Sequence, residues 1–141
     1  FLGSLDGLFS SSRCSIKLYV QPMSRPQRRC PFVEEGNAFI KHDGSVSPCM
    51  ALLHSATSYW ANQKRTVHHH AFGNIQREGL SAIWQKDEYE KFRDTVRRFE
   101  FSPCFRCTPC DGWEQNLTDC FGNTKPTCGA CLWAEGLINC P

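Results

Sequence analysis

Cysteine is the residue type in this chain with the clearest potential for chemistry. The chain has ten cysteines in 141 residues, and most of them lie in its last third. Two stretches there carry the Cys-x2-Cys spacing, which brings two thiolates to one metal centre from a single tight turn. The cysteines of this region are Cys104, Cys107, Cys110, Cys120, Cys128, Cys131 and Cys140.

The cysteine-rich segment, residues 104–141, is not expected to order itself through an apolar core. Glycine and proline interrupt it repeatedly, so it has no continuous apolar face to bury. Disulfides, zinc or iron–sulfur clusters could order it instead. Disulfides do not need the Cys-x2-Cys spacing, whereas both kinds of metal site use it.

The composition describes a globular chain of one domain or slightly more. Four Trp and ten Phe argue against disorder, and no apolar run is long enough to cross a bilayer. A net charge of +2 argues against a dedicated nucleic-acid surface. Residues 1–12 lack the basic region and cleavage site of a signal peptide. We therefore expect a cytoplasmic protein that binds neither nucleic acid nor membrane.

Without a secretion signal, so many cysteines favour metal over disulfides. Cys14 precedes a predicted strand, Ser15–Val20, and has no partner at metal spacing, so we do not expect it to be a ligand. Cys30, Cys49 and the seven cysteines of the segment 104–141 remain as candidate ligands. Two sites of four thiolates would use eight of these nine and leave one spare, but this arithmetic does not distinguish iron from zinc.

A β-hairpin is predicted between Cys30 and Cys49. Its strands are Asn37–Lys41 and Ser45–Cys49, and Asp43-Gly44 is typical of a type I′ turn. Such a hairpin would bring Cys49 close to Cys30, so two cysteines far apart in sequence could share one site.

Two helices are predicted between the hairpin and the cysteine-rich segment. The first has apolar residues at helical spacing around Ile83, and the second begins near Asp87 and ends before Pro103. The arginines of the second helix are expected largely outside the core; they are Arg93, Arg97 and Arg98. We expect the following side chains to be buried: Phe39, Ile75, Ile83, Trp84, Phe92, Val96 and Phe99.

Three further stretches are expected to carry no site. Residues 52–67 are predicted to form a loop with a short helix. The three histidines of His68–His70 point in different directions on any regular element, which favours a solvated or packing role over metal binding. The glycosylation sequon at Asn116 is interpreted as chance. The predicted fold is a small α+β domain with a hairpin, a few helices and a loop-dominated, metal-binding cysteine-rich segment.

The spacing of Cys30, Gly44 and Cys49, followed by a helical gap, a Cys-x2-Cys pair and a late lone cysteine, resembles the SPASM domain. That domain is the C-terminal auxiliary-cluster domain of many radical SAM enzymes. Residues 43–49 and 72–75 are also similar to it.

The C-terminal motifs look like those of the radical SAM maturases linked to tungsten-cofactor aldehyde oxidoreductases. These motifs are Asp119-Cys120-Phe121-Gly122-Asn123, Pro126-Thr127-Cys128-Gly129, Cys131-Leu132-Trp133-Ala134 and Cys140-Pro141. Together with the SPASM-like motifs, the resemblance covers residues 30–141.

The resemblance implies two auxiliary [4Fe–4S] clusters that relay electrons or hold substrate. Cys30 and Cys49 match ligands of the first cluster, and Cys107 and Cys110 match a pair of the second. Later ligands would be Cys128, Cys131 and Cys140, with Cys131 returning to the first cluster. Cys104 and an insertion with Cys120 depart from the family pattern, and we expect one of these two as the extra ligand of the first cluster.

The resemblance also implies a larger enzyme. Residues 1–29 would be a connector or the end of an upstream radical SAM barrel, and residues 30–141 the auxiliary-cluster domain. The Cys-x3-Cys-x2-Cys spacing that holds the SAM-cleaving cluster is absent. We therefore expect SAM to bind only on the barrel, in the same chain or a partner, and the isolated chain to be inactive. A tungstopterin oxidoreductase is a candidate partner.

Two alternatives stay open at this point. One is a zinc-stabilised binding module without a redox role, and the other is a disulfide scaffold. Iron–sulfur protein purified without oxygen would be brown, whereas both alternatives are colourless.

Overall fold

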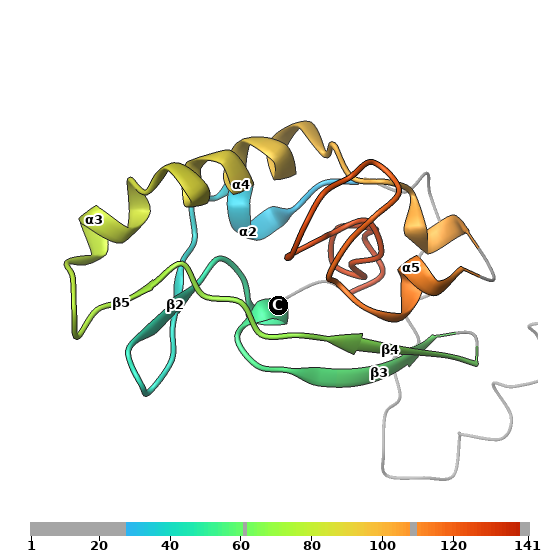
Figure 1. The fold of residues 1–141 in the computed structure, drawn as a ribbon, viewed down its shortest axis with the longest axis horizontal. Coiled ribbons are helices and arrows are strands. Elements are labelled where there is room, and N and C mark those ends of the chain that lie inside the picture. Colours follow the sequence, from blue (N-terminus) through green and yellow to red (C-terminus); the bar gives the residue numbers. More distant parts are fainter. Residues whose placement is uncertain (1–27, 61, 108–109, 139–141) are drawn as a thin grey trace, which may run out of the picture.

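The computed structural model describes residues 28–60, 62–107 and 110–138 (Figure 1). Cys14, Cys140 and the predicted strand Ser15–Val20 lie outside these ranges. The helices and strands confirm the predicted small α+β fold. In chain order they are α2 (Pro31–Glu34), β1 (Phe39–Ile40), β2 (Ser45–Ser47), the 3₁₀ turn η1 (Met50–Leu52), β3 (Ala56–Trp60), β4 (Gln63–Val67), β5 (Gly73–Asn74), α3 (Leu80–Trp84), α4 (Asp87–Arg98), the 3₁₀ turn η2 (Cys104–Arg106) and α5 (Asp111–Glu114).

The predicted hairpin is present as β1 and β2, with Phe39 opposite Ser47, and β5 adds a third antiparallel strand. The loop between the two strands has three residues, one more than the predicted two-residue type I′ turn. Lys41 accepts a hydrogen bond from the N–H of Gly44, and the N–H of Lys41 donates to the carbonyl of Ser45. Only Gly44 in this loop has a positive φ, of 83°, so the loop is a three-residue turn with a left-handed last residue and not a type I′ turn.

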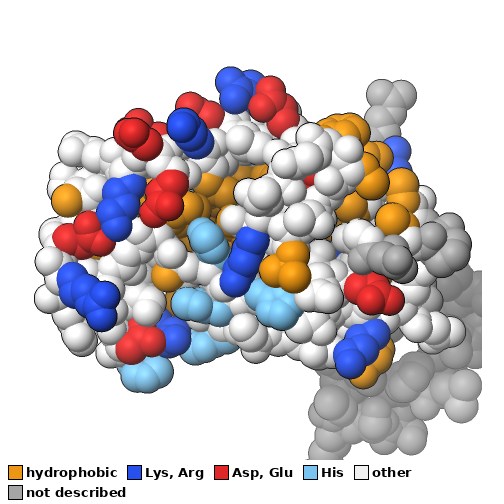
Figure 2. All heavy atoms as spheres, in the orientation of Figure 1, with side chains coloured by type: hydrophobic (Ala, Val, Ile, Leu, Met, Phe, Trp, Pro, Cys, Tyr) orange, Lys and Arg blue, Asp and Glu red, His pale blue; other side chains and the backbone are white. Residues whose placement is uncertain are grey.

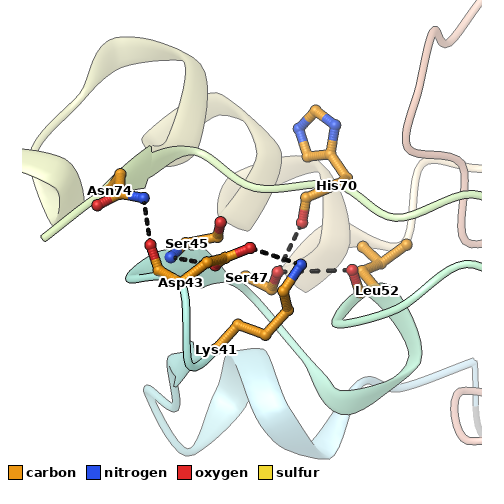
Figure 3. A network of polar contacts seen from close by, with 7 residues as sticks. All are labelled: Lys41, Asp43, Ser45, Ser47, Leu52, His70 and Asn74. Carbon is orange, nitrogen blue, oxygen red and sulfur yellow. Dashed lines mark hydrogen bonds and ion pairs between the residues drawn. The ribbon is translucent and has the colours of Figure 1, made fainter. Parts of the chain in front are cut away.

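A polar network holds the hairpin loop against the strands beside it (Figure 3). The Asp43 carboxylate accepts a hydrogen bond from the N–H of Ser45 and pairs with Lys41 at 2.7 Å. Lys41 and Ser45 hold the pKa of the Asp43 carboxyl well below its usual range. Asn74 donates its side-chain amide to the Asp43 carbonyl at 2.8 Å. A Cβ at Gly44 would lie 2.6 Å from the Asn74 side chain, so this position requires glycine.

Residues 56–67 form a second hairpin, β3–β4, so the prediction of a loop with a short helix for residues 52–67 is wrong. The two strands are antiparallel, with Thr57 opposite Thr66, and Asn62 in the reversal has a φ of 64°. Every side chain of β3 is exposed, and Tyr59 is 71% exposed. A fully exposed strand has no alternation between apolar and polar positions, so the periodicity that identifies most strands is missing.

The helices form one side of the molecule, above the sheet in the view of Figure 1. Ile83 and Val96 are fully buried, as predicted, and Tyr89 of α4 is fully buried as well. Ile75 was expected in the core but is 43% exposed, because it lies in the turn after β5. Arg93 was expected outside but is 5% exposed, because its guanidinium lies over the Trp84 and Tyr89 rings.

Helix α4 ends at Arg98, before the predicted stop at Pro103. Phe99 follows it in a left-handed conformation, with a φ of 50°. This conformation is unfavourable for a bulky residue. Burial of the Phe99 ring against Phe101, with ring centroids 5.7 Å apart, opposes that cost.

Two of the three histidines, His68 and His70, have hydrogen-bonding or packing contacts through their rings. The His70 ring lies edge-on to Phe72 at 4.7 Å, and the His68 ring is 2.7 Å from the Gln115 side-chain oxygen. Figure 2 shows histidines gathered near the centre of one face, with acidic and basic side chains interspersed toward the helices. In the part of the chain described, no helix combines the length and apolar character needed to span a membrane.

Phe92 joins two parts of the core and provides a test of the helix assignment. It packs both against the cluster of Phe32, Val33 and Val96 and against that of Val46, Phe72 and Ile83. Phe92→Ala should therefore lower the free energy of unfolding by ~3 kcal/mol, measured by chemical denaturation. Lys91→Ala, at an exposed position of the same helix, is the matched control and should change stability little. Equal stability of the two variants would contradict the packing described.

Candidate metal centre

Cys30 is positioned by the start of α2. Pro31 occupies the first helical position, where the missing N–H is not needed. The N–H of Arg29 donates to the carbonyl of Ala134 at 3.0 Å, which ties this segment to the C-terminal loops. Burial raises the pKa of the Cys30 thiol to about 11, and the backbone N–H groups of Val33 and Phe32 act in the opposite direction.

Cys49 occupies an equivalent position before η1. Strand β2 leads into it, and Ser47 anchors that strand by donating its hydroxyl to the His70 carbonyl at 2.8 Å (Figure 3). Cys49 is buried, and burial raises the pKa of its thiol, while the backbone N–H groups of Leu52 and Ala51 oppose the shift. Cys30 and Cys49 thus each stand at the beginning of a helical turn whose N–H groups can stabilise a thiolate.

Cys128 and Cys131 lie in the loops that follow α5. The N–H of Cys131 donates to the carbonyl of Cys128 at 3.0 Å, which closes the tight turn predicted from the Cys-x2-Cys spacing. A further turn follows, in which Glu135 donates its N–H to Cys131. Burial raises the pKa of both thiols, and the N–H groups of Ala134 and Trp133 oppose this for Cys131.

Four thiols from three separate segments converge: Cys30, Cys49, Cys128 and Cys131. In each of the six possible pairs, a negative charge on one thiolate raises the pKa of the other. Cys30 and Cys49 also share a core cluster, against which Cys128 and Cys131 pack. The hairpin therefore brings Cys49 to Cys30 as predicted. The companion of Cys131 in this group is Cys128.

A second group of cysteines begins at Cys104. This thiol is buried and lies 2.9 Å from the Ser102 hydroxyl. Burial raises its pKa, the Ser102 hydroxyl lowers it, and Asp119 and Cys120 raise it further. Cys107 directly follows η2, and its N–H donates to the Cys104 carbonyl at 3.2 Å.

The neighbourhood of Cys104 and Cys120 is built by Asp119. Its carboxylate accepts hydrogen bonds from the N–H groups of Ser102 at 3.0 Å and of Phe121 and Asn123, both also at 3.0 Å. These contacts pin the loop that carries Cys120 onto the residues just before Cys104. Cys110 immediately precedes α5 and is partly buried, whereas Cys107 and Cys120 are exposed.

Two buried indole N–H groups have no hydrogen-bond acceptor: those of Trp113 and Trp133. Trp113 packs with Cys104 in one core cluster, and Trp133 packs against the cluster that contains Cys30 and Cys49. A buried donor without an acceptor is costly. Inorganic sulfide bound among the thiols would offer such an acceptor, so an iron–sulfur cluster suits the donor set of both groups.

The described cysteines form neither disulfides nor a compact site for a single metal ion. All eight cysteines in the described ranges are free, so no disulfide forms among them. One tetrahedral zinc with bonds of about 2.3 Å needs sulfurs about 3.8 Å apart. In the described residues, no group of three or more His, Cys, Asp or Glu side chains lies close enough to hold a single metal ion. A four-iron cluster spreads its thiolates over a larger tetrahedron.

The glycosylation sequon is buried within this region, in agreement with its interpretation as chance. Asn116 is 1% exposed. Its side-chain oxygen accepts the N–H of His68 at 2.7 Å, and its amide donates to the His68 carbonyl at 3.1 Å. A glycan at this nitrogen would disrupt both contacts.

Comparison with known proteins agrees with this geometry. The model of the SPASM family, an iron–sulfur cluster-binding domain, matches residues 30–111. A tungsten-containing aldehyde ferredoxin oxidoreductase cofactor-modifying protein of Pyrococcus furiosus is 32% identical over 120 residues, which cover 83% of this chain and 33% of that protein. The chain thus spans about a third of the length of this relative. No solved structure matches. The chain belongs to the SPASM family of iron–sulfur cluster-binding domains.

Proposed function

We propose that this domain is the auxiliary-cluster module of a radical SAM maturase and that it holds two [4Fe–4S] clusters. The convergence of four thiols, two buried and two partly buried, at one apolar core cluster is the observation that carries the proposal. Four thiolates are the complete protein donor set of one such cluster.

We assign Cys30, Cys49, Cys128 and Cys131 to the first cluster. The resemblance to the family led us to expect Cys104 or Cys120 as the fourth ligand. The proximity of Cys128 to the other three thiols supports Cys128 in that role. The backbone N–H groups facing Cys30, Cys49 and Cys131 would stabilise their thiolates once metal displaces the protons.

The second cluster would draw its ligands from the remaining cysteines of the segment 104–141. Four of them are within the described ranges, and Cys140 lies outside; the candidates are Cys104, Cys107, Cys110, Cys120 and Cys140. One of these five would be the spare thiol. Ser102 supports Cys104 as a ligand, because its hydroxyl can donate to the thiolate.

Bound clusters would supply one-electron transfer and a binding surface for substrate, next to a SAM-binding barrel on another domain. We propose residues 1–29 as the connector to that barrel and residues 30–141 as the cluster domain. The name of the Pyrococcus furiosus relative supports a role in modifying the cofactor of a tungsten enzyme. A tungstopterin oxidoreductase is accordingly the proposed partner. Free thiols suit the reducing cytoplasm as its location.

Ligand substitution tests the two-cluster proposal. Protein purified without oxygen should be brown and contain iron. Cys131→Ala should lose the iron of one cluster and keep the other, and Cys107→Ala should do the same for the second cluster. The double variant should lose both. Iron per chain and the visible spectrum are the measurements.

Cys14→Ser serves as the control for these variants, because it removes a cysteine that we do not expect to bind metal. Its iron content should equal that of the unchanged protein. A colourless protein with stoichiometric zinc would favour the zinc-stabilised binding module instead, and a loss of iron in Cys14→Ser would contradict the ligand assignment.

Metal removal should unfold the C-terminal loops selectively. Residues 110–138 contain few helical residues and only a small apolar cluster around Trp113, so thiolate–metal bonds would supply most of their order. A chelator or oxygen should raise amide exchange across these residues, while α4 stays protected in part. Equal protection of these loops with and without metal would contradict this account.

A further inference from the structure

Arg65 is a buried cation whose position the cysteine pattern does not explain. It lies on β4 and is 5% exposed. Its guanidinium donates a hydrogen bond to the carbonyl oxygen of Trp113, and the guanidinium carbon lies 5.4 Å from the centre of the Trp113 ring. These contacts hold the charge inside the protein, next to the aromatic residue that packs on Cys104.

No carboxylate compensates this charge within the described part of the chain, where the ion pairs all involve other basic residues. The acidic groups that act on the guanidinium are the thiols of Cys131, Cys104 and Cys128. They belong to both cysteine groups. Burial lowers the pKa of Arg65, while these three thiolates raise it. An arginine remains charged in proteins, so a buried one without a counter-ion is costly.

The fold fixes the strand that carries Arg65 through contacts with the segment that follows α5. The neighbouring Thr66 forms a parallel bridge with Gln115, just after α5. His68, further along, exchanges two backbone hydrogen bonds with the Asn116 side chain. Strand β4 is thereby fixed to the segment that connects Cys110 with Cys120, and the guanidinium could leave the interior only by breaking its hydrogen bond to the Trp113 carbonyl.

We propose that Arg65 is a positioning residue that serves as the shared counter-charge of both thiolate groups and favours the reduced state of the centres they bind. The inference rests on the proposed function. Four thiolates give an oxidised [4Fe–4S] centre a net negative charge, and one electron from an external reductant makes it more negative by one. A fixed cation nearby stabilises the product more than the reactant, because Coulomb energy scales with the product of the charges.

The test compares redox titrations of three variants of the full chain with clusters assembled without oxygen. Arg65→Gln removes the positive charge. Arg65→Lys keeps the charge but replaces the planar guanidinium with an ammonium group. Arg97→Gln removes an exposed arginine of α4 and is the control. Dithionite titration followed by electron paramagnetic resonance gives the midpoint potentials, and iron per chain and circular dichroism report cluster content and folding.

We expect Arg65→Gln to make the reduction equilibrium at least tenfold less favourable, a shift of about 59 mV to more negative potential for one electron. Arg65→Lys should stay near the unchanged protein, as should Arg97→Gln. If Arg65→Gln does not assemble clusters but Arg65→Lys does, the charge is required for binding, which also supports the proposal.

Unchanged potentials in Arg65→Gln would overturn the inference. Equal shifts, or equal loss of iron, in Arg65→Gln and Arg65→Lys would also overturn it, because they would show that the shape of the guanidinium and not its charge matters. Failure of the proposed function itself is distinguishable, since the unchanged protein would then assemble no iron–sulfur clusters at all.

Discussion

The packing of four thiols, two buried and two partly buried, at one apolar cluster is the constraint on which the rest of this structure depends. Burial raises the pKa of each thiol, and a charge on any one opposes ionisation of the other three. At neutral pH the group can become a set of thiolates only if a multivalent cation joins it. The turns that begin after Cys30 and Cys49, with N–H groups directed at the sulfurs, lower the cost of that ionisation. Arg65 adds a buried positive charge, held by its hydrogen bond to the Trp113 carbonyl.

The long sequence separation of these thiols makes the surrounding contacts necessary. Cys30 and Cys49 come together through a short-range hairpin, but Cys128 and Cys131 return only after both helices and a further hairpin. Closing such a long loop costs conformational entropy. Two backbone contacts close this loop. One is the hydrogen bond from Arg29 to Ala134, and the other is the bridge between Thr66 of β4 and Gln115 after α5. A metal centre between the segments would act as the remaining cross-link.

Local features could be predicted from the sequence better than contacts between segments that are far apart in it. The hairpin at Gly44 and helix α4 follow from turn chemistry and from apolar spacing, and both were confirmed. Strand β3 was missed because its side chains are all exposed. Spacing could show that Cys128 and Cys131 form a turn, but not which partners that turn would meet, since this depends on tertiary packing. No pattern marks Arg65, because one basic residue in a polar strand has no distinguishing period.

The most direct test of the central claim is a crystal structure of the protein purified without oxygen, with anomalous diffraction measured at the iron edge. The account predicts two separate iron peaks in each chain. One should lie among the sulfurs of Cys30, Cys49, Cys128 and Cys131, and the other near Cys104. Iron bound to Cys30 and Cys49 together with Cys104 or Cys120, and not with Cys128, would contradict it, as would a single zinc ion in place of the first peak.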